Sequence, residues 1–142
     1  MDYETVLARD LGASLRGLGL NILVRDVMAE VEILAQVFDM KAHQVSKDFA
    51  IMRYGAQLFQ VHADATYAAN PLLSVLPDMP PRGAGIEIRL YDTDPDDAVL
   101  RAKAARLTVL QEPTDKPHGL REAYILCHDG YAWVPSRPKI VR

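Results

Sequence analysis

The sequence predicts an α+β fold made of two βαβββ modules, which together form a cup-shaped mixed sheet. Two observations mark each module: an alternating apolar run that ends in an aspartate, and an amphipathic run directly behind it. Three short strand-like runs then follow in each module, so the same order of elements occurs twice. We therefore expect an N-terminal helix (1–17), a first module (18–64), a Pro-rich connector (65–83), a second module (84–138) and a tail (139–142).

Residues 2–16 are expected to form a short amphipathic helix. Apolar side chains recur there at steps of three and four residues, which places them on one helix face. They are Tyr3, Val6, Leu7, Leu11 and Leu15. Gly17 and Gly19 then end the helix.

The first module begins with a strand that ends at Asp26. Leu20, Ile22 and Val24 occupy alternate positions, which is the period of a strand with one buried face. Asp26 is a candidate N-cap for the amphipathic helix that follows. Three strands complete the module, in residues 41–46, 48–54 and 56–64, with a turn at Gly55.

The second module opens with the clearest strand signal in the chain. Ile86, Ile88 and Leu90 alternate with polar residues, so we expect these three side chains to face the helix of their module. Glu87 and Arg89 leave the opposite side of the same strand. That side would line the cup, where the pair contacts a ligand or forms an exposed ion pair of little energetic value.

The helix of the second module has a strong start signal. Asp94 is a candidate N-cap, and Pro95 stands at the first helical position, where its missing N–H costs nothing. Asp96 and Asp97 add negative charge at the positive end of the helix dipole. Three strands are expected after the helix, within residues 107–115, 116–130 and 131–138.

Composition excludes several classes of protein. The chain has 142 residues, 49% apolar and 25% charged, which is typical of a globular body with a core. The formal charge of −3, with no run of Lys or Arg, argues against nucleic-acid binding. No apolar run is long enough to span a membrane, and a single cysteine, Cys127, excludes an internal disulfide. We expect a cytoplasmic protein that contacts neither nucleic acid nor membrane.

Motifs near the C-terminus resemble a known superfamily. A Gly-Xaa-Arg-Glu segment is followed by a glycine turn and an aromatic-rich last strand, although Cys127-His128 replaces the Asp-Pro usual before the turn. The matching residues are Gly119, Arg121, Glu122, Gly130, Tyr131 and Trp133. Over about residues 18–138 the chain resembles the vicinal oxygen chelate superfamily, the glyoxalase/bleomycin-resistance/extradiol-dioxygenase group. The resemblance implies the cup described above.

The resemblance also implies where a metal would be held, and this sequence lacks the ligands. The superfamily's first-strand ligand positions correspond to Gly19 and Gly85, and its last-strand position corresponds to Val134. None of these side chains can coordinate a metal ion, and Gln60 at the remaining position offers a single amide oxygen. We therefore expect no metal and no other cofactor.

Without a metal, the cup should remain a pocket for a small molecule. Its candidate ligand-binding residues combine alternate strand positions with one loop: Asn21, Gln60, His62, Glu87, Arg89, His118, Arg121 and Tyr124, with Leu23 and Val134 as apolar lining. Arg89 and Arg121 could bind an acidic or phosphorylated compound as paired donors. Alternatively, Arg121 pairs with a neighbouring strand, and His62 is simply solvated or hydrogen-bonded.

The functional hypothesis is a glyoxalase/bleomycin-resistance-like protein that binds a small organic molecule without metal. Two alternatives stay open at this point. One is a lyase, isomerase or dioxygenase of the same superfamily, using His62, Glu87 or His118 as a displaced ligand set or an acid/base pair. The other is a non-catalytic interaction module whose cup is filled by its own side chains. Because each half leaves one sheet face open, we also expect a homodimer.

Overall fold

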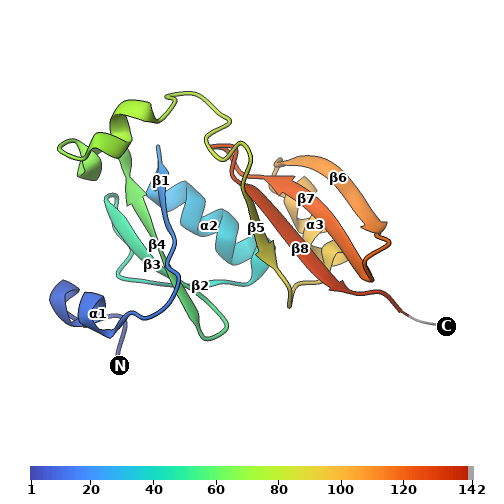
Figure 1. Ribbon diagram of the computed structural model, residues 1–142, viewed down its shortest axis with the longest axis horizontal. Coiled ribbons are helices and arrows are strands. Elements are labelled where there is room, and N and C mark those ends of the chain that lie inside the picture. Colours follow the sequence, from blue (N-terminus) through green and yellow to red (C-terminus); the bar gives the residue numbers. More distant parts are fainter. Residues whose placement is uncertain (141–142) are drawn as a thin grey trace. The chain divides into compact units, whose positions relative to one another are not determined.

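The structure, a computed structural model, describes residues 1–140 and divides the chain into two compact units. The first contains Met1–Ala35 and Asp39–Val75, and the second begins at Leu76 and takes in Gln36–Phe38. Each unit contains one four-stranded mixed sheet (Figure 1). Among these residues, no helix is both long and apolar enough to cross a membrane.

The first unit confirms the order of elements predicted for the first module. Its elements are α1 (Ala8–Ser14), β1 (Asn21–Val24), all but the last three residues of α2 (Val27–Phe38), β2 (Lys41–His43), β3 (Phe49–Tyr54), β4 (Gln57–Ala63) and two short 3₁₀ helices, η1 (Asp64–Tyr67) and η2 (Pro71–Val75). The strand order is β1-β4-β3-β2, with β1 parallel to β4. Asp26 caps α2, because its carboxylate accepts a hydrogen bond from the Ala29 amide at 3.1 Å.

The second unit repeats this plan. Its elements are β5 (Glu87–Leu90), α3 (Pro95–Ala104), β6 (Thr108–Asp115), β7 (Leu120–Leu126) and β8 (Ala132–Pro138), in the strand order β5-β8-β7-β6. Asp94 caps α3 by accepting from the Asp96 amide at 3.3 Å, and Pro95 is the first helical residue. α3 packs against β6, β7 and β8 and covers one face of the sheet (Figure 1).

Each unit has its own set of buried apolar side chains. In the first, Ile22, Val24 and Val61 are at most 3% exposed, and Leu34 of α2 is fully buried. In the second, Ala98 and Ala102 of α3 are fully buried. The strand residues Leu90, Ala123, Ile125 and Trp133 are at most 3% exposed. Alternate apolar positions supply part of these cores, as the sequence predicts, but β1, β3 and β8 also bury consecutive residues, so both faces of these strands carry buried side chains.

Two local predictions were wrong. The N-terminal helix is shorter than residues 2–16, because Gln44 Nε2 donates to the carbonyl oxygens of Tyr3 and Val6 and holds this stretch as a turn outside α1. Ile86 does not face the helix but is 60% exposed. It precedes β5, and its amide donates to the Gly83 carbonyl at 3.1 Å instead of pairing with β8.

The end of the connector is held against the turn that precedes β8. The Arg82 amide donates to the Asp129 carbonyl at 2.8 Å, and the Gly83 amide donates to the Gly130 carbonyl at 3.3 Å. Gly130 has a φ of +81°, and a Cβ atom there would lie 2.5 Å from Pro81 Cα. Only glycine satisfies both constraints, which explains the glycine turn seen in the sequence.

Candidate functional site

The face of the second sheet opposite α3 carries a cluster of polar side chains. In the strand register Arg89 pairs with Val134, and Glu122 pairs with Ser136. Paired residues of neighbouring strands point to the same side, as do residues two apart on one strand. We call this side the open face and define it by five residues: Glu87 and Arg89 of β5, Glu122 and Tyr124 of β7, and Ser136 of β8.

Arg89 lies at the centre of the open face. Its guanidinium forms an ion pair and a hydrogen bond with Glu122, and it also donates to Glu87 Oε2 and Ser136 Oγ, each at 3.3 Å. The Glu122 side chain is only 3% exposed and that of Arg89 is 20% exposed. Desolvation lowers the pKa of Arg89, but the hydrogen bond and charge of Glu122 more than offset this and raise it. Arg89 therefore remains charged.

Glu87 forms the outer part of the cluster. Its side chain is 44% exposed, and it accepts a hydrogen bond from the Tyr124 hydroxyl. This bond, followed by the contact with Arg89, lowers the pKa of Glu87, and the same bond raises the pKa of Tyr124. At neutral pH the open face thus presents an ionised glutamate beside a neutral tyrosine.

His118 stands in the loop before β7 and reaches the same cluster. Its Nε2 atom lies 3.5 Å from Glu122 Oε2, and its side chain is 52% exposed. The structure therefore brings together four of the residues expected to bind a ligand: Glu87, Arg89, His118 and Tyr124. Glu122 and Ser136 belong to the same cluster but were not among the residues expected to bind a ligand. Period-two alternation along β7 would have placed Glu122 beside Tyr124.

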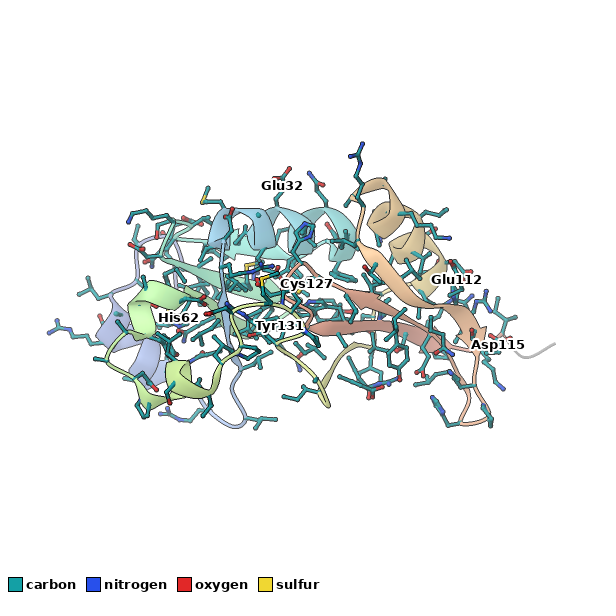
Figure 2. The ribbon with its side chains drawn as sticks, turned by 90° about the horizontal axis from the view of Figure 1, so that it is seen from above. Glu32, His62, Glu112, Asp115, Cys127 and Tyr131 are labelled. Atoms are coloured by element: carbon teal, nitrogen blue, oxygen red, sulfur yellow. The ribbon has the colours of Figure 1, made fainter. Side chains whose placement is uncertain are left out.

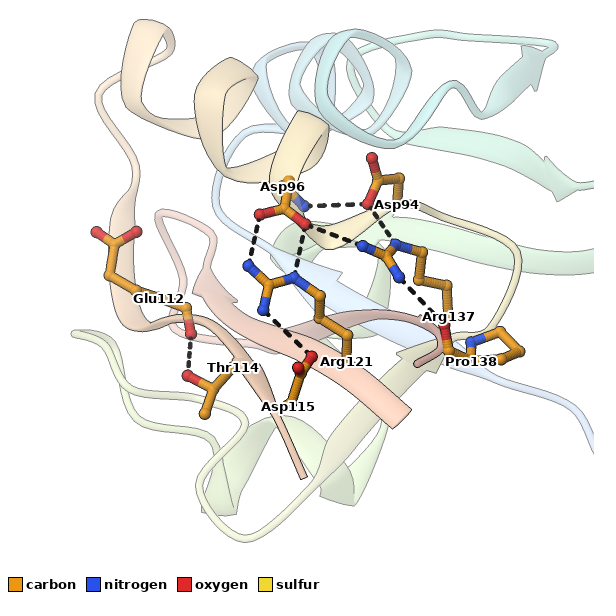
Figure 3. Close-up of polar contacts among 8 residues, drawn as sticks. All are labelled: Asp94, Asp96, Glu112, Thr114, Asp115, Arg121, Arg137 and Pro138. Atoms are coloured by element: carbon orange, nitrogen blue, oxygen red, sulfur yellow. Dashed lines mark hydrogen bonds and ion pairs between the residues drawn. The ribbon is translucent and has the colours of Figure 1, made fainter. Parts of the chain in front are cut away.

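Arg121 lies on the other side of β7, facing α3 (Figure 3). Its Nε and Nη2 atoms donate to the two carboxylate oxygens of Asp96, both at 2.8 Å, and Nη1 donates to Asp115 at 3.2 Å. The first of these contacts, with Asp96, raises the pKa of Arg121, and the same hydrogen bonds lower the pKa of Asp96. Arg89 and Arg121 are therefore not assembled as a pair of anion donors. The alternative prediction, that Arg121 pairs with a neighbouring strand, agrees with its hydrogen bond to Asp115 on β6.

The remaining expected residues belong to the first unit. His62 is a residue of β4 and is labelled in Figure 2. Its Nε2 atom lies 3.1 Å from Gln60 Oε1, and the rings of Phe49 and Tyr67 lie 5.1 and 5.2 Å from its own ring. Burial lowers the pKa of His62, so it is neutral at pH 7. Asn21 is exposed, whereas Leu23 is only 2% exposed. Gln60 and His62 therefore form a small group of their own.

The residues at the superfamily's metal positions do not fit a metal ion. Gly85 precedes β5 and has no side chain, and Val134 is fully buried opposite Arg89 in the strand register. Within the described chain, no three histidine, cysteine, aspartate or glutamate side chains converge as a metal site requires. The side chains at these positions therefore offer no ligand set for a metal ion.

No protein-family model matches the sequence, and no curated protein matches it either. Solved structures do match. A glyoxalase/bleomycin resistance protein/dioxygenase family enzyme from Burkholderia phytofirmans PsJN has a TM-score of 0.71 at 19% identity, over 84% of this chain and 96% of that one. A glyoxalase/bleomycin resistance protein/dioxygenase from Nocardioides has a TM-score of 0.66 at 17% identity, over 92% and 89%. A glyoxalase-related enzyme from Fulvimarina pelagi has a TM-score of 0.69 at 13% identity, over 87% of this chain and 88% of that one.

These similarities confirm the fold that the sequence predicts. The chain has the glyoxalase/bleomycin-resistance/dioxygenase fold, with a four-stranded mixed sheet in each of its two units. Sequence identity is below 20% in all three cases, so the similarity shows the fold alone. The function must be argued from the side chains.

Proposed function

We propose that this protein binds a small organic molecule on the open face of its second sheet, without a metal ion. The observation that carries the proposal is the ion pair between Arg89 and Glu122, whose side chains are 20% and 3% exposed. Desolvating two charges costs about as much as their attraction returns, so apolar residues would stabilise this position equally well. Convergent polar groups with shifted pKa values are instead characteristic of binding sites.

The strands hold this cluster in a fixed arrangement. The contributing residues come from three neighbouring strands, β5, β8 and β7, whose register fixes the direction of each side chain. Hydrogen bonds from Arg89 to Glu122 and Ser136, and from Tyr124 to Glu87, restrict the rotamers further. A site built on strands in this way is preorganised, which reduces the entropy lost when a ligand binds. Solved structures of the same fold include proteins named as enzymes and as resistance proteins, which fits a ligand-binding role.

A thermal-shift screen of small aromatic and charged compounds, followed by amide chemical-shift mapping, tests the proposal. A ligand present at one hundred times its dissociation constant stabilises the folded state by about 2.7 kcal/mol. The hits should shift the amide signals of β5, β7 and β8. Hits that shift only signals elsewhere, or the absence of hits, would contradict the proposal.

Tyr124→Phe is the matching variant for this screen. It removes the hydroxyl that orients Glu87 and should weaken binding about fivefold, the value of one hydrogen bond. Glu112→Gln is the control, because Glu112 pairs with Lys103 of α3 at 2.7 Å and lies outside the open face. Arg89→Ala is less suitable, since it would leave Glu122 buried without its ion-pair partner. If the wild type and Tyr124→Phe bind the ligand with equal affinity, Tyr124 does not belong to the binding site.

A second candidate function is metal-free acid/base catalysis, favoured by His118. This imidazole is half exposed and lies 3.5 Å from the buried Glu122 carboxylate, the arrangement of a proton-transferring group held by a carboxylate. Lyase or isomerase chemistry on a bound ligand would then require His118, and His118→Gln would abolish turnover while preserving binding. A purely structural interaction module would bind no small molecule, so the same screen separates it from both functions.

A further inference from the structure

We infer that the ligand of the open face is an organic cation, such as a primary ammonium compound, and that Glu87 determines this selectivity. The inference rests on the proposed function above and names its ligand class. It follows from which hydrogen-bonding groups of the open face are already used and which remain available to a ligand.

The donors of the open face are largely used. Arg89 donates through Nη1 to Glu87 and through Nη2 to Glu122 and Ser136, and its guanidinium carbon lies 5.5 Å from the centre of the Tyr91 ring. Ser136 Oγ donates to the Val134 carbonyl at 3.1 Å. The charge of Arg89 is thus already paired with two carboxylates, with which an anionic ligand would have to compete. Arg121 cannot help, because it is bound on the other side of β7.

The acceptors, in contrast, remain available. A carboxylate offers about four lone-pair sites, and Glu87 uses one oxygen for Tyr124 and the other for Arg89. The Tyr124 oxygen has donated its hydrogen to Glu87 and also interacts with Arg89, so toward a ligand it can act only as an acceptor. Glu87 is 44% exposed and its lowered pKa keeps it ionised, so the accessible part of the cluster is an anionic acceptor. A ligand ammonium supplies both the charge and the N–H donors that this arrangement lacks.

Two further groups bear on the charge at this position. The positive charge of Lys116 acts on Glu87 through space, after the nearer effects of Tyr124 and Arg89. His118 lies against Glu122, the inner carboxylate, at 3.5 Å. Lys116 and His118 lie in the loop before β7, and the hydrogen bonds that the described residues make to the Glu87 oxygens come from Tyr124 and Arg89.

Three probes of similar size test the inference: benzylammonium, benzyl alcohol and benzoate. Each is titrated into the full-length protein at pH 7, and binding is followed by amide shifts of β5, β7 and β8. We expect benzylammonium to bind most tightly, and Glu87→Gln to weaken it about tenfold. Glu112→Gln, which removes an equal charge outside the open face, should change the affinity less than twofold. Added salt should weaken benzylammonium more than benzyl alcohol.

The outcomes separate this inference from the proposed function. If benzoate or benzyl alcohol shifts the open-face amides at least as strongly as benzylammonium, the protein binds small molecules there but the selectivity for cations is wrong. Unchanged benzylammonium affinity in Glu87→Gln would likewise refute the role of Glu87. If no probe and no compound of the wider screen shifts these amides, both the proposed function and the inference fail.

Discussion

Replacing Asp96 by asparagine should destabilise the protein and alter the response of its stability to acid. Asp96 lies in the first turn of α3 and receives two hydrogen bonds of 2.8 Å from Arg121, with a weaker contact of 3.5 Å from Arg137 (Figure 3). Hydrogen bonds to charged groups contribute about 1.5–3 kcal/mol, and exposed ion pairs at most about 1 kcal/mol. The side chains of Asp96 and Arg121 are 42% and 27% exposed, so we expect a loss of about 1–2 kcal/mol in the free energy of unfolding.

The pH dependence gives this prediction a second, independent test. The Arg121 hydrogen bonds lower the pKa of Asp96 in the folded state. A carboxylate whose pKa is lowered by folding contributes stability that is present above its unfolded pKa and is lost as the pH falls through its folded pKa. The difference between wild type and Asp96→Asn should therefore be largest at neutral pH and shrink below about pH 4.

Urea unfolding monitored by circular dichroism between pH 7 and pH 3 measures both effects. Asp97→Asn is the matched control, because Asp97 is exposed in the same helical turn and shares the favourable dipole interaction, about 0.3–1 kcal/mol. Combining Asp96→Asn with Arg121→Met should cost clearly less than the sum of the two single changes. Equal losses in Asp96→Asn and Asp97→Asn, or a difference that does not change with pH, would refute the reasoning.

Four further predictions follow from the same structure. Glu122→Leu alone should cost about 2–3 kcal/mol, because it leaves Arg89 without its buried partner, and adding Arg89→Met should restore part of this loss in urea unfolding. Gly130→Ala should lower the free energy of unfolding by more than about 1 kcal/mol, because the backbone φ there is +81° and the added Cβ atom would collide with Pro81. Gly12→Ala is the control and should be neutral or stabilising, because its added Cβ atom meets no atom within 4 Å. Elemental analysis of protein purified without chelator should find no stoichiometric divalent metal, and a stoichiometric ion would overturn the metal-free proposal. Sedimentation at micromolar concentration should give a dimer, since each sheet has one face without a helix of its own module; a monomer mass would disprove this.

Elements governed by local sequence could be predicted well. Asp26 and Asp94 cap their helices as expected, because a capping side chain reaches only two or three residues along the chain. The alternation placed Glu87 and Arg89 together on one side of β5, since side-chain direction in a strand depends on position. In β1 it did not separate buried from exposed residues, because Leu23 is buried like Ile22 and Val24. Gly55 has a φ of +58° at the turn between β3 and β4.

Features set by distant partners could not be predicted in this way. Ile86 continues the apolar alternation, but the strand begins one residue later, where pairing of Glu87 with Ala132 of β8 starts. Hydrogen bonds from Gln44, about 40 residues away, likewise hold Tyr3 and Val6 outside α1. In both cases a tertiary contact decides where the regular element begins.

The candidate site shows the same division between local and distant information. The sequence indicated that Glu87 and Arg89 share a face, and the structure agrees. The sequence could not reveal that Glu122, 33 residues further along the chain, forms an ion pair with Arg89. Because of this pair, the Arg89 guanidinium is not free to bind an anionic ligand. This one contact is the reason why we infer a cation and not an acidic compound as the ligand, because it leaves an acceptor as the accessible group.

β7 shows why two similar ion pairs should have different roles. Arg121 and Glu122 are adjacent, so their side chains leave opposite faces, and each pairs with an oppositely charged residue of another element. The pair of Arg121 with Asp96 joins the sheet to the first turn of α3, so its loss should loosen the packing of a helix over the core. The pair of Arg89 with Glu122 joins two strands of a sheet whose register β8 already fixes, so it adds little to the arrangement of the backbone. Changes on the α3 side of β7 should therefore appear mainly in stability, whereas conservative changes on the open face, such as Glu87→Gln and Tyr124→Phe, should appear mainly in ligand affinity.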